Sequence, residues 1–357
     1  MENLSDSFRV ESLVKLSTDL ATRSAALKLV EIAIIVLLNT ISVFGNILVC
    51  IAVYRNLRLR NVTSIFVITL ALSDLAMGCF AMPITSGILI YGKFPYARSV
   101  CYLHGFCIFT FAIFSLETLC AIAINRYFCV VKPQHYSSFF TLKRAFCYIM
   151  FAFSISLTCS IPPLLTLDIH YAFQPGKAMC LYPFESSLSF TLFLEIVCIN
   201  IPLAIIAMCY FKVYKVVRDA NRTFAQNNRG QTGHSTKQLS ANVEEAKVTK
   251  TLVAVLIGFV SCWLPISVVD IIDVVMGAPT LPRQLYLTYA LLAYTSSTIN
   301  PFIYGVFNRT FRKEFKKILV CVFRLRKNQV MSDQDQRVAW DESNEIWENK
   351  SNYVKYI

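Results

Sequence analysis

The sequence predicts an all-α membrane protein: a seven-transmembrane helix bundle, with a short amphipathic helix on its cytoplasmic side after the seventh span. Three observations lead to this fold class. The chain of 357 residues is 55% hydrophobic and only 16% charged, whereas soluble domains have about 25% charged residues. Its apolar residues form seven blocks, each near or above the roughly 20 residues that a helix needs to cross hydrocarbon. Lysine and arginine are concentrated in alternate connections between these blocks.

The blocks define the domain organisation. Irregular backbone cannot face lipid, so each block is expected to be helical. Residues 1–28 form an N-terminal segment, residues 29–307 the bundle and residues 320–357 a cytoplasmic tail. A third inner loop at about 219–242 is rich in Asn, Gln, Ser, Thr and Gly without apolar periodicity, which predicts disorder. The seven blocks are Leu29–Val53, Val62–Tyr91, Cys101–Ile124, Ala145–Leu167, Ser186–Phe211, Thr251–Met276 and Leu285–Phe307.

The distribution of charge predicts an extracellular N-terminus and a cytoplasmic tail. The three connections on one side carry three, four and eight lysine and arginine residues and the tail carries eleven, which makes 26 of the 34; the other side carries eight. By the positive-inside rule the basic side is cytoplasmic. The net charge of +12 then suits anionic lipid and an acidic protein partner at the inner surface. It gives no reason to invoke nucleic acid.

Residues 308–319 are predicted to form an amphipathic helix on the inner leaflet. Basic residues fill one face of this helix, and the opposite face is apolar. Cys321 lies just beyond the helix and is a candidate palmitoylation site. The apolar face consists of Phe311, Phe315, Ile318 and Leu319.

Two features are expected on the outer side. Of thirteen cysteines, most lie inside spans and two are cytoplasmic, where thiols stay reduced. Only Cys101 and Cys180 are clearly extracellular, so a disulfide between them is the economical interpretation; it would close a loop of about eighty residues. Asn3 begins the one N-glycosylation sequon on the outer side.

Polar and kinking residues inside the spans require structural explanations. Asp74 lies in the middle of the second block, where a carboxylate costs at least about 2.5 kcal/mol, so it must face the bundle and have partners. Pro83 predicts a kink in the outer half of the same block. For Gly45-Asn46 in the first block two interpretations are open: helix contact with a hydrogen bond across the bundle, or a functional role.

Motifs in six spans occur in an order that resembles the rhodopsin-like family of G-protein-coupled receptors. The resemblance covers about residues 29–319. It implies a plasma-membrane receptor, not an enzyme, that binds an extracellular small molecule or peptide in the outer bundle. Such a receptor activates a heterotrimeric G protein at its inner face. The matching residues are Gly45-Asn46, Leu70 to Asp74, Cys101, Asn125-Arg126-Tyr127, Pro202, Tyr210, Cys262-Trp263-Leu264-Pro265, Asn300-Pro301 and Tyr304.

The resemblance also implies roles for individual residues. Arg126 would pair with Glu245 in the closed state and release it in the open state, which makes the pair a two-state element. The full activation switch would consist of Asn125, Arg126, Tyr127, Tyr210, Glu245, Asn300, Pro301 and Tyr304. A lever in span six would consist of Leu116, Pro202, Phe259, Trp263 and Pro265. An internal sodium site of oxygen ligands would consist of Asp74, Ser115, Ser297 and Asn300.

The chain departs from the family pattern at three positions. Asn125 stands where most members have an acid, which removes a local partner of Arg126 and leads to the hypothesis of raised basal activity. Phe153 stands roughly in the place of the usual tryptophan of span four. Tyr294 replaces the lysine that binds retinal in light receptors, so no covalent retinal cofactor is expected.

The class of ligand stays open at this stage. Ile108 stands where amine receptors have an aspartate, so a monoamine would lack its usual counter-ion. Glu195, Asp270 and Asp273 face the outer half and could bind a cationic ligand or a basic peptide. Alternatively they are solvated rim charges, an interpretation that fits Asp273 better than Glu195. The candidate ligand-binding residues are Ile108, Glu195, Trp263, Asp270 and Tyr294.

Two segments, Ala123 to Tyr127 and Phe311 to Glu314, are similar to melatonin receptors. Those receptors have alanine where this chain has Pro301 and histidine where it has Cys198.

Two functions other than a signalling receptor are compatible with a helical membrane protein. A transporter or channel is disfavoured because the number of spans is odd and no internal repeat is visible. A receptor-like protein that does not signal is disfavoured by the intact Arg126, Pro265 and Tyr304. Enzymatic chemistry finds no support, since the four histidines form no metal-binding spacing and no phosphate-binding glycine loop occurs.

Overall fold

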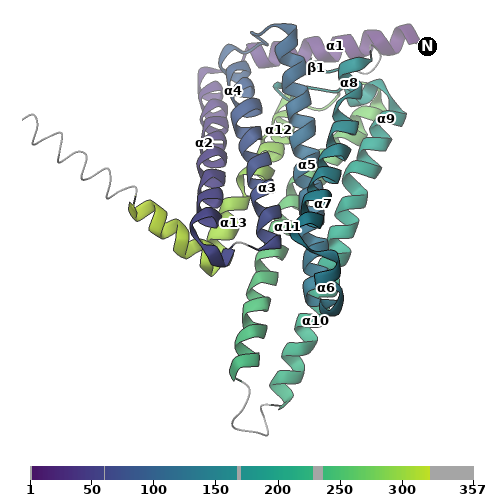
Figure 1. Cartoon of the computed structure of the whole chain (residues 1–357). Coiled ribbons are helices and arrows are strands. Elements are labelled where there is room, and N and C mark those ends of the chain that lie inside the picture. The colour runs from purple at the N-terminus through teal and green to yellow at the C-terminus, as the bar shows by residue number, and fades with distance from the viewer. Residues whose placement is uncertain (1, 60, 167–169, 228–235, 322–357) are drawn as a thin grey trace, which may run out of the picture.

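The structure is a computed structural model that describes residues 2–59, 61–166, 170–227 and 236–321 (Figure 1). Side chains are not described for some of these residues, among them 2–6 and 236–253. Six helical runs in this part of the chain are long and apolar enough to cross a membrane. They comprise α2 (Ala25–Arg55), α3 to α4 (Val62–Ala76 and Met82–Tyr91), α5 (Arg98–Val130), α7 to α8 (Leu142–Ser160 and Pro162–Leu165), α9 to α10 (Leu188–Phe193 and Ile201–Asn227) and α11 (Thr236–Met276).

The seventh span is divided into α12 (Arg283–Thr298) and α13 (Asn300–Phe307). Pro301 explains the division, because proline has no N–H to donate to the carbonyl four residues earlier, on Ser297. The side chain of Asn46 on α2 donates to that carbonyl instead, with 3.2 Å between its Nδ2 and the oxygen. A Cβ on the neighbouring Gly45 would meet the Pro301 ring at 2.8 Å. Of the two interpretations of Gly45-Asn46, the structure supports the packing role. Gly45 lets α2 approach the divided seventh span, and Asn46 satisfies the carbonyl of Ser297.

Two spans contain a wide π-helical turn just before a proline. These turns are η2 (Met77–Ala81), which precedes Pro83, and η4 (Leu194–Asn200), which precedes Pro202. A proline ring crowds the preceding turn and removes one hydrogen bond, and a π turn accommodates both effects. The irregularity expected from Pro83 is present in this form.

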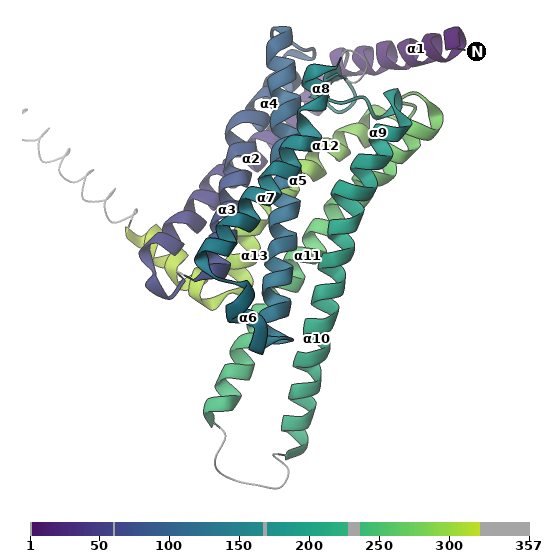
Figure 2. The ribbon, with the colours of Figure 1, turned by 45° about the vertical axis from the view of Figure 1, so that its right-hand side comes forward.

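The third span, α5, is the centre of the bundle. It packs against α3, α7 and α10 and, at its outer end, against the strand β2 (Met179–Leu181). Leu70 of α3 and Leu116 of α5 are among the largest fully buried side chains. The seven spans run in one bundle with α5 among them in both views (Figures 1 and 2).

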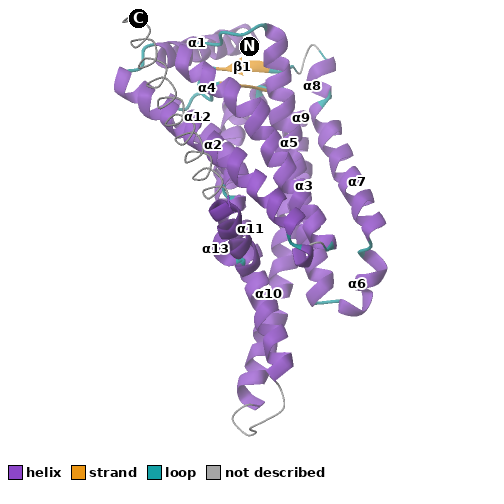
Figure 3. Ribbon diagram, turned by 60° about the vertical axis from the view of Figure 1, so that its left-hand side comes forward, coloured by secondary structure: helices purple, strands orange, loops and turns teal. Residues whose placement is uncertain are grey.

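The outer end is covered by two elements that the composition did not predict. The helix α1 (Glu2–Ala21) lies across the outer end of the bundle (Figures 1 and 2), and its own Leu16 and Leu20 are buried. The strands β1 (Ala172–Gln174) and β2 form an antiparallel hairpin in which Phe173 faces Cys180 (Figure 3). Residues 172–181 are followed by the short helix η3 (Phe184–Ser186).

The inner end is also more helical than predicted. The helix α10 continues to Asn227 and α11 begins at Thr236, so helix covers both ends of the segment 219–242. A polar segment of this kind extends a helix that already exists at little cost, because propagation adds one hydrogen bond for each residue fixed. The two inner elements not foreseen are η1 (Leu57–Leu59) and α6 (Pro133–Phe139).

The amphipathic helix after the seventh span occupies residues 309–321. Phe311 and Ile318 are buried, and the Phe311 ring stacks on Tyr304 of α13 with 5.3 Å between centroids. Leu319, predicted to lie on the same apolar face, has 44% of its surface exposed. Cys321, the candidate palmitoylation site, is exposed at the end of this helix.

Candidate functional site

The disulfide between Cys101 and Cys180 is present, with a Cα–Cα distance of 5.4 Å and a sequence separation of 79. It joins the start of α5 to β2. The backbone N–H of Cys180 also donates to Nδ1 of the buried His104, at 3.3 Å. Both links hold the hairpin over the outer end of α5, so that the turn between its strands, Pro175 to Ala178, projects over the bundle.

Beneath the hairpin lies a small cavity of about 50 Å³. Of the five candidate ligand residues, Ile108, Trp263 and Asp270 line this cavity. Tyr294 is fully buried and forms a hydrogen bond with Thr85 at 2.7 Å between their hydroxyl oxygens. Most of the remaining lining is apolar: Phe109, Ala112, Ile113, Leu181, Phe184, Leu194, Cys198 and Ile199, with Tyr289.

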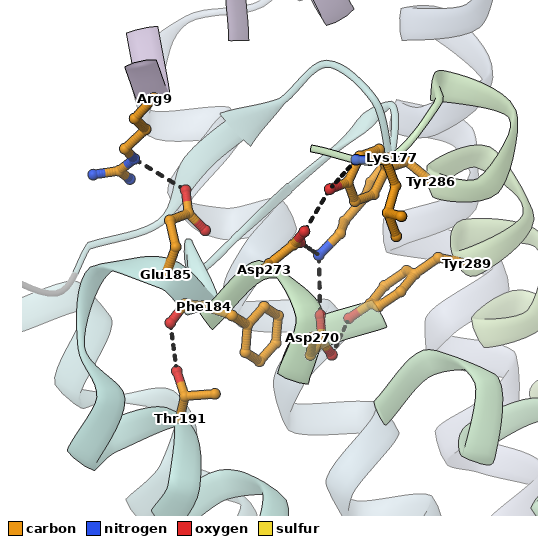
Figure 4. A network of polar contacts seen from close by, with 10 residues as sticks. Arg9, Lys177, Phe184, Glu185, Thr191, Asp270, Asp273, Tyr286 and Tyr289 are labelled. Atoms are coloured by element: carbon orange, nitrogen blue, oxygen red, sulfur yellow. Dashed lines mark hydrogen bonds and ion pairs between the residues drawn. The ribbon is translucent and has the colours of Figure 1, made fainter. Parts of the chain in front are cut away.

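One residue of this site, Lys177, was not singled out from the sequence. It extends from the hairpin turn into the outer bundle, where its Nζ lies 3.0 Å from Oδ1 of Asp270 and 3.5 Å from Oδ2 of Asp273 (Figure 4). Burial alone lowers the pKa of this amine, but Asp270 and Asp273 outweigh that effect and raise the pKa above its usual value. The amine is therefore an ammonium ion at physiological pH. The signal available in the sequence was the Pro-Gly pair of Gln174-Pro175-Gly176-Lys177 between two short apolar runs, which is typical of a hairpin turn.

The three outer acids are buried and none is a solvated rim charge. Glu195 and Asp273 are each only 2% exposed and Asp270 is 1% exposed. Glu195, at the start of the π turn η4, lies beside the Ser267 side chain. It lies close enough to Lys177 and Asp270 to interact electrostatically with both. Their burial therefore favours a functional role for these three acids over the interpretation as solvated rim charges.

The expected lever residues lie together at the level of the cavity floor. The Trp263 and Phe259 rings stack with 5.5 Å between centroids and an interplanar angle of 18°. Leu116 is fully buried in the same core, and Pro265 lies inside α11 two residues beyond Trp263. Pro202 lies in α10 just after η4. The Nε1 of Trp263 is buried and has no hydrogen-bond partner in the described residues.

Asp74 is fully buried at mid-bundle, as expected from its sequence position. Its carboxylate accepts hydrogen bonds from Ser115 Oγ at 3.2 Å and from Asn300 Nδ2 at 2.8 Å. Ser297, the fourth predicted sodium ligand, is buried nearby on α12. No lysine or arginine forms an ion pair with Asp74 among the described residues.

At the inner end of α5, Asn125 is fully buried and joins two other elements. Its Oδ1 accepts a hydrogen bond from Thr63 Oγ1 on α3 at 2.8 Å, and its Nδ2 donates to Tyr136 Oη on α6 at 3.3 Å. Asn125 therefore ties α3, α5 and α6 together. The sequence did not indicate this role. Thr63 is distant from Asn125 in sequence, and Tyr136 lies on α6, a helix that was not predicted.

Arg126 and its expected partners lie together as far as the structure describes them. Tyr210 and Tyr304 are buried and close enough to Arg126 for electrostatic interaction. The ring of Tyr127 lies 5.6 Å from the ammonium of Lys212. The side chain of Glu245 lies outside the described residues, as does that of Asn3, the predicted glycosylation site.

These features define an integral membrane protein with helical spans, an outer cavity covered by the hairpin and a buried carboxylate, that of Asp74, at mid-bundle. A family model described as "7 transmembrane receptor (rhodopsin family)" matches residues 45–304, which is well over half of the chain. The chain belongs to this family of G-protein-coupled signalling receptors.

Its curated relatives include melatonin receptors. The type 1C receptor of Gallus gallus is 28% identical over 291 residues, which cover 81% of this chain and 81% of the relative. The type 1A receptor of Ovis aries is 25% identical over 291 residues, or 81% of this chain and 76% of the relative. Among solved structures, squid rhodopsin has a TM-score of 0.73 at 22% identity, covering 84% of this chain and 87% of that one. This last likeness supports the seven-helix fold.

Proposed function

We propose that this receptor resides in the plasma membrane with its N-terminus outside, binds its ligand in the cavity above Trp263 and activates a heterotrimeric G protein at the inner end of α5. The observation that carries the proposal is the placement of Trp263. Its ring forms part of the cavity wall and stacks on Phe259, one turn further into the bundle on the same helix. A ligand in the cavity would thus contact the helix whose inner half must move for G-protein binding.

The test of this function needs no ligand. We would express the full chain at the cell surface and record basal dissociation of each Gα class from Gβγ. Arg126→Glu is expected to abolish any signal above background, because a carboxylate reverses the charge presented to the G protein. Melatonin, the ligand in the relatives' names, is added in a second arm. Equal signals from wild type and Arg126→Glu, at equal surface expression, would contradict G-protein activation through Arg126.

The same assay tests the hypothesis of raised basal activity. Asn125→Asp is expected to lower basal signalling severalfold. The new carboxylate can still accept the Thr63 hydrogen bond and adds a negative charge next to Arg126, which stabilises the closed position. Asn125→Ala is the control, because it removes the links to Thr63 and Tyr136 without adding charge. Unchanged signalling in Asn125→Asp would exclude the hypothesis.

We also propose that Asp74 holds a sodium ion. Its site fits a hard monovalent cation: one buried carboxylate, the hydroxyls of Ser115 and Ser297, and no positive side chain paired with the acid in the described part of the chain. Asn46 Oδ1 is a further buried oxygen that receives no hydrogen bond from any described residue. Described residues also offer no cluster of three or more His, Cys, Asp or Glu that would suit a transition metal.

Sodium binding predicts a specific dependence of stability on salt. At a sodium concentration ten times Kd, the stabilisation is about 1.4 kcal/mol, since the ion binds only the folded state. The purified receptor should therefore unfold at a higher temperature in NaCl than in choline chloride of equal ionic strength. Asp74→Asn should remove the difference. A difference that persists in Asp74→Asn would place the ion elsewhere.

We also propose that this receptor does not bind retinal covalently. A Schiff base requires a lysine amine, and Tyr294 occupies that position with its hydroxyl bonded to Thr85. Absorption spectra of the receptor incubated with 11-cis-retinal and then denatured in acid would reveal a covalent adduct if one formed.

A further inference from the structure

The surroundings of Lys177 have the chemistry of a cation-binding site. Its ammonium group contacts two carboxylates, those of Asp270 and Asp273. It also lies over three aromatic rings, with distances from Nζ to the ring centroids of 4.2 Å for Tyr289, 4.9 Å for Phe184 and 5.7 Å for Tyr286. Carboxylates combined with aromatic faces are the groups with which proteins recognise organic ammonium ions.

The acids of this site are positioned independently of Lys177. The hydroxyl of Tyr289 donates to Oδ2 of Asp270 at 3.0 Å, and the hydroxyl of Tyr286 donates to Oδ1 of Asp273 (Figure 4). Both tyrosines come from α12, whereas both acids come from α11. The bundle therefore positions the two acids and the two tyrosines, whereas Phe184 comes from η3 and the ammonium from the hairpin turn.

The hairpin turn is shaped to deliver this one side chain. A Cβ on Gly176 would meet the Tyr286 ring at 2.8 Å, so only glycine allows the turn to lie this close to α12. Ala178, the residue after Lys177, has a φ of 51°, in the left-handed region. The two strands of the hairpin are only three residues long each, and the Cys101–Cys180 disulfide holds just one of them. The turn is thus a short tether, and it brings Lys177 to the site from outside the spans.

A third buried acid, Glu195, lies close to the cation site. Glu195 is buried beside the Ser267 side chain and lies close enough to Lys177 and Asp270 to interact electrostatically with both. Asp270, Asp273 and Glu195 thus lie near the ammonium group of Lys177, and Glu185, which pairs with Arg9, also acts on it. Asp270 and Tyr289 also line the cavity beneath the hairpin, so the cation site and the cavity are continuous.

We propose that Asp270, Asp273, Phe184, Tyr286 and Tyr289 form a cation subsite of the ligand cavity, that Lys177 occupies it as a tethered cation, and that the ligand carries a basic amine which replaces Lys177. This inference rests on the proposed function for the assignment of the cavity to the ligand. A tethered group competes with an effective concentration in the millimolar range. A free amine must therefore be present at comparable concentration, or gain affinity from the apolar cavity, to displace it.

The proposal is tested by chemical rescue on the purified full-length receptor, with thermal unfolding as the readout. Lys177→Ala removes three methylene groups and the ammonium, which together correspond to n-propylammonium. We expect this variant to unfold about 5 °C or more below wild type, because the buried acids lose their cation. Millimolar n-propylammonium chloride should restore most of this loss in a saturable manner. The uncharged 1-propanol should not.

Three comparisons make the rescue specific. Wild type should show no comparable gain with n-propylammonium, since Lys177 already fills the site. The double variant Lys177→Ala/Asp270→Asn should not be rescued. Lys93→Ala, which removes an exposed lysine on the same side of the bundle, should leave the unfolding temperature unchanged. Absence of rescue in a folded Lys177→Ala variant, or equal rescue by 1-propanol, would overturn the proposal.

If Lys177→Ala does not fold, Lys177→Arg and Lys177→Met decide the matter. Arginine keeps the positive charge and should unfold within about 2 °C of wild type, whereas methionine has similar volume without charge and should unfold well below it. Equal unfolding temperatures for these two variants would contradict a cation site. None of these measurements requires a G protein, so a receptor that is silent in the basal signalling assay can still pass or fail this test.

Discussion

Replacing Glu31 with alanine is expected to lower the free energy of unfolding by about 3 to 5 kcal/mol, the usual cost of removing one partner from a buried ion pair. Glu31 on α2 forms ion pairs with both Arg23 and Arg283, and all three side chains are 4% exposed or less. Arg23 also donates to the backbone carbonyls of Leu20 and Leu89. Arg283, in contrast, has no other acidic partner in the described residues. Removing Glu31 therefore leaves a buried guanidinium unpaired at the outer end of the seventh span.

The effect is measured by thermal or chemical unfolding of the purified receptor. Glu11→Ala is the matched control, because Glu11 is an exposed glutamate on α1 at the same end of the molecule. The double variant Glu31→Ala/Arg283→Met should recover part of the loss, since it removes the unpaired charge as well. Similar unfolding of Glu11→Ala and Glu31→Ala would show that the charge cluster does not stabilise the bundle.

Loss of the disulfide is expected to have an effect of similar size. Cys101→Ala/Cys180→Ala should destabilise the receptor by about 4 to 5 kcal/mol on the chain-entropy estimate for a loop of 79 residues. It should also release the hairpin that carries Lys177, so the alkylammonium should stabilise this variant as it stabilises Lys177→Ala. The two effects have separate readouts: the unfolding temperature without ligand, and its increase with n-propylammonium.

Cys79→Ala controls for the loss of cysteine itself, because Cys79 is a free, exposed thiol. It is expected to unfold like wild type. If the disulfide variant loses stability but gains nothing from n-propylammonium, the hairpin keeps Lys177 in place without the disulfide. If it loses no stability, the bridge does not constrain the unfolded chain as the estimate assumes.

The long apolar blocks and the motifs were sufficient to predict the bundle, because membrane spans are governed by local composition. A helix in hydrocarbon must satisfy its own backbone and be apolar along about 20 residues, and both properties can be read from the chain. The Cys101–Cys180 bridge followed in the same way from the side of the membrane on which each cysteine lies. Asp74 could be placed inside the bundle because the alternative, an acid facing lipid, is too costly.

The outer site was only partly predictable. Glu195 and Asp270 were recognised as unusual from their position in apolar spans, but whether they are solvated or buried depends on what covers them. That cover is the hairpin, and its lysine comes from a loop 93 residues away from Asp270 in sequence. The helix α1 could have been found from Leu13, Leu16 and Leu20, which recur at helical spacing.

By itself, the sequence determined that the protein is a seven-span receptor of the rhodopsin family, because spans and family motifs are local patterns. Only the tertiary structure decided which polar groups meet. It paired Asn46 with the carbonyl that Pro301 leaves free, Asn125 with Thr63 and Tyr136, and Lys177 with Asp270 and Asp273. The physical reason is that a hydrogen bond or ion pair depends on a few ångströms of separation, and residues distant in sequence acquire that proximity only when the helices pack.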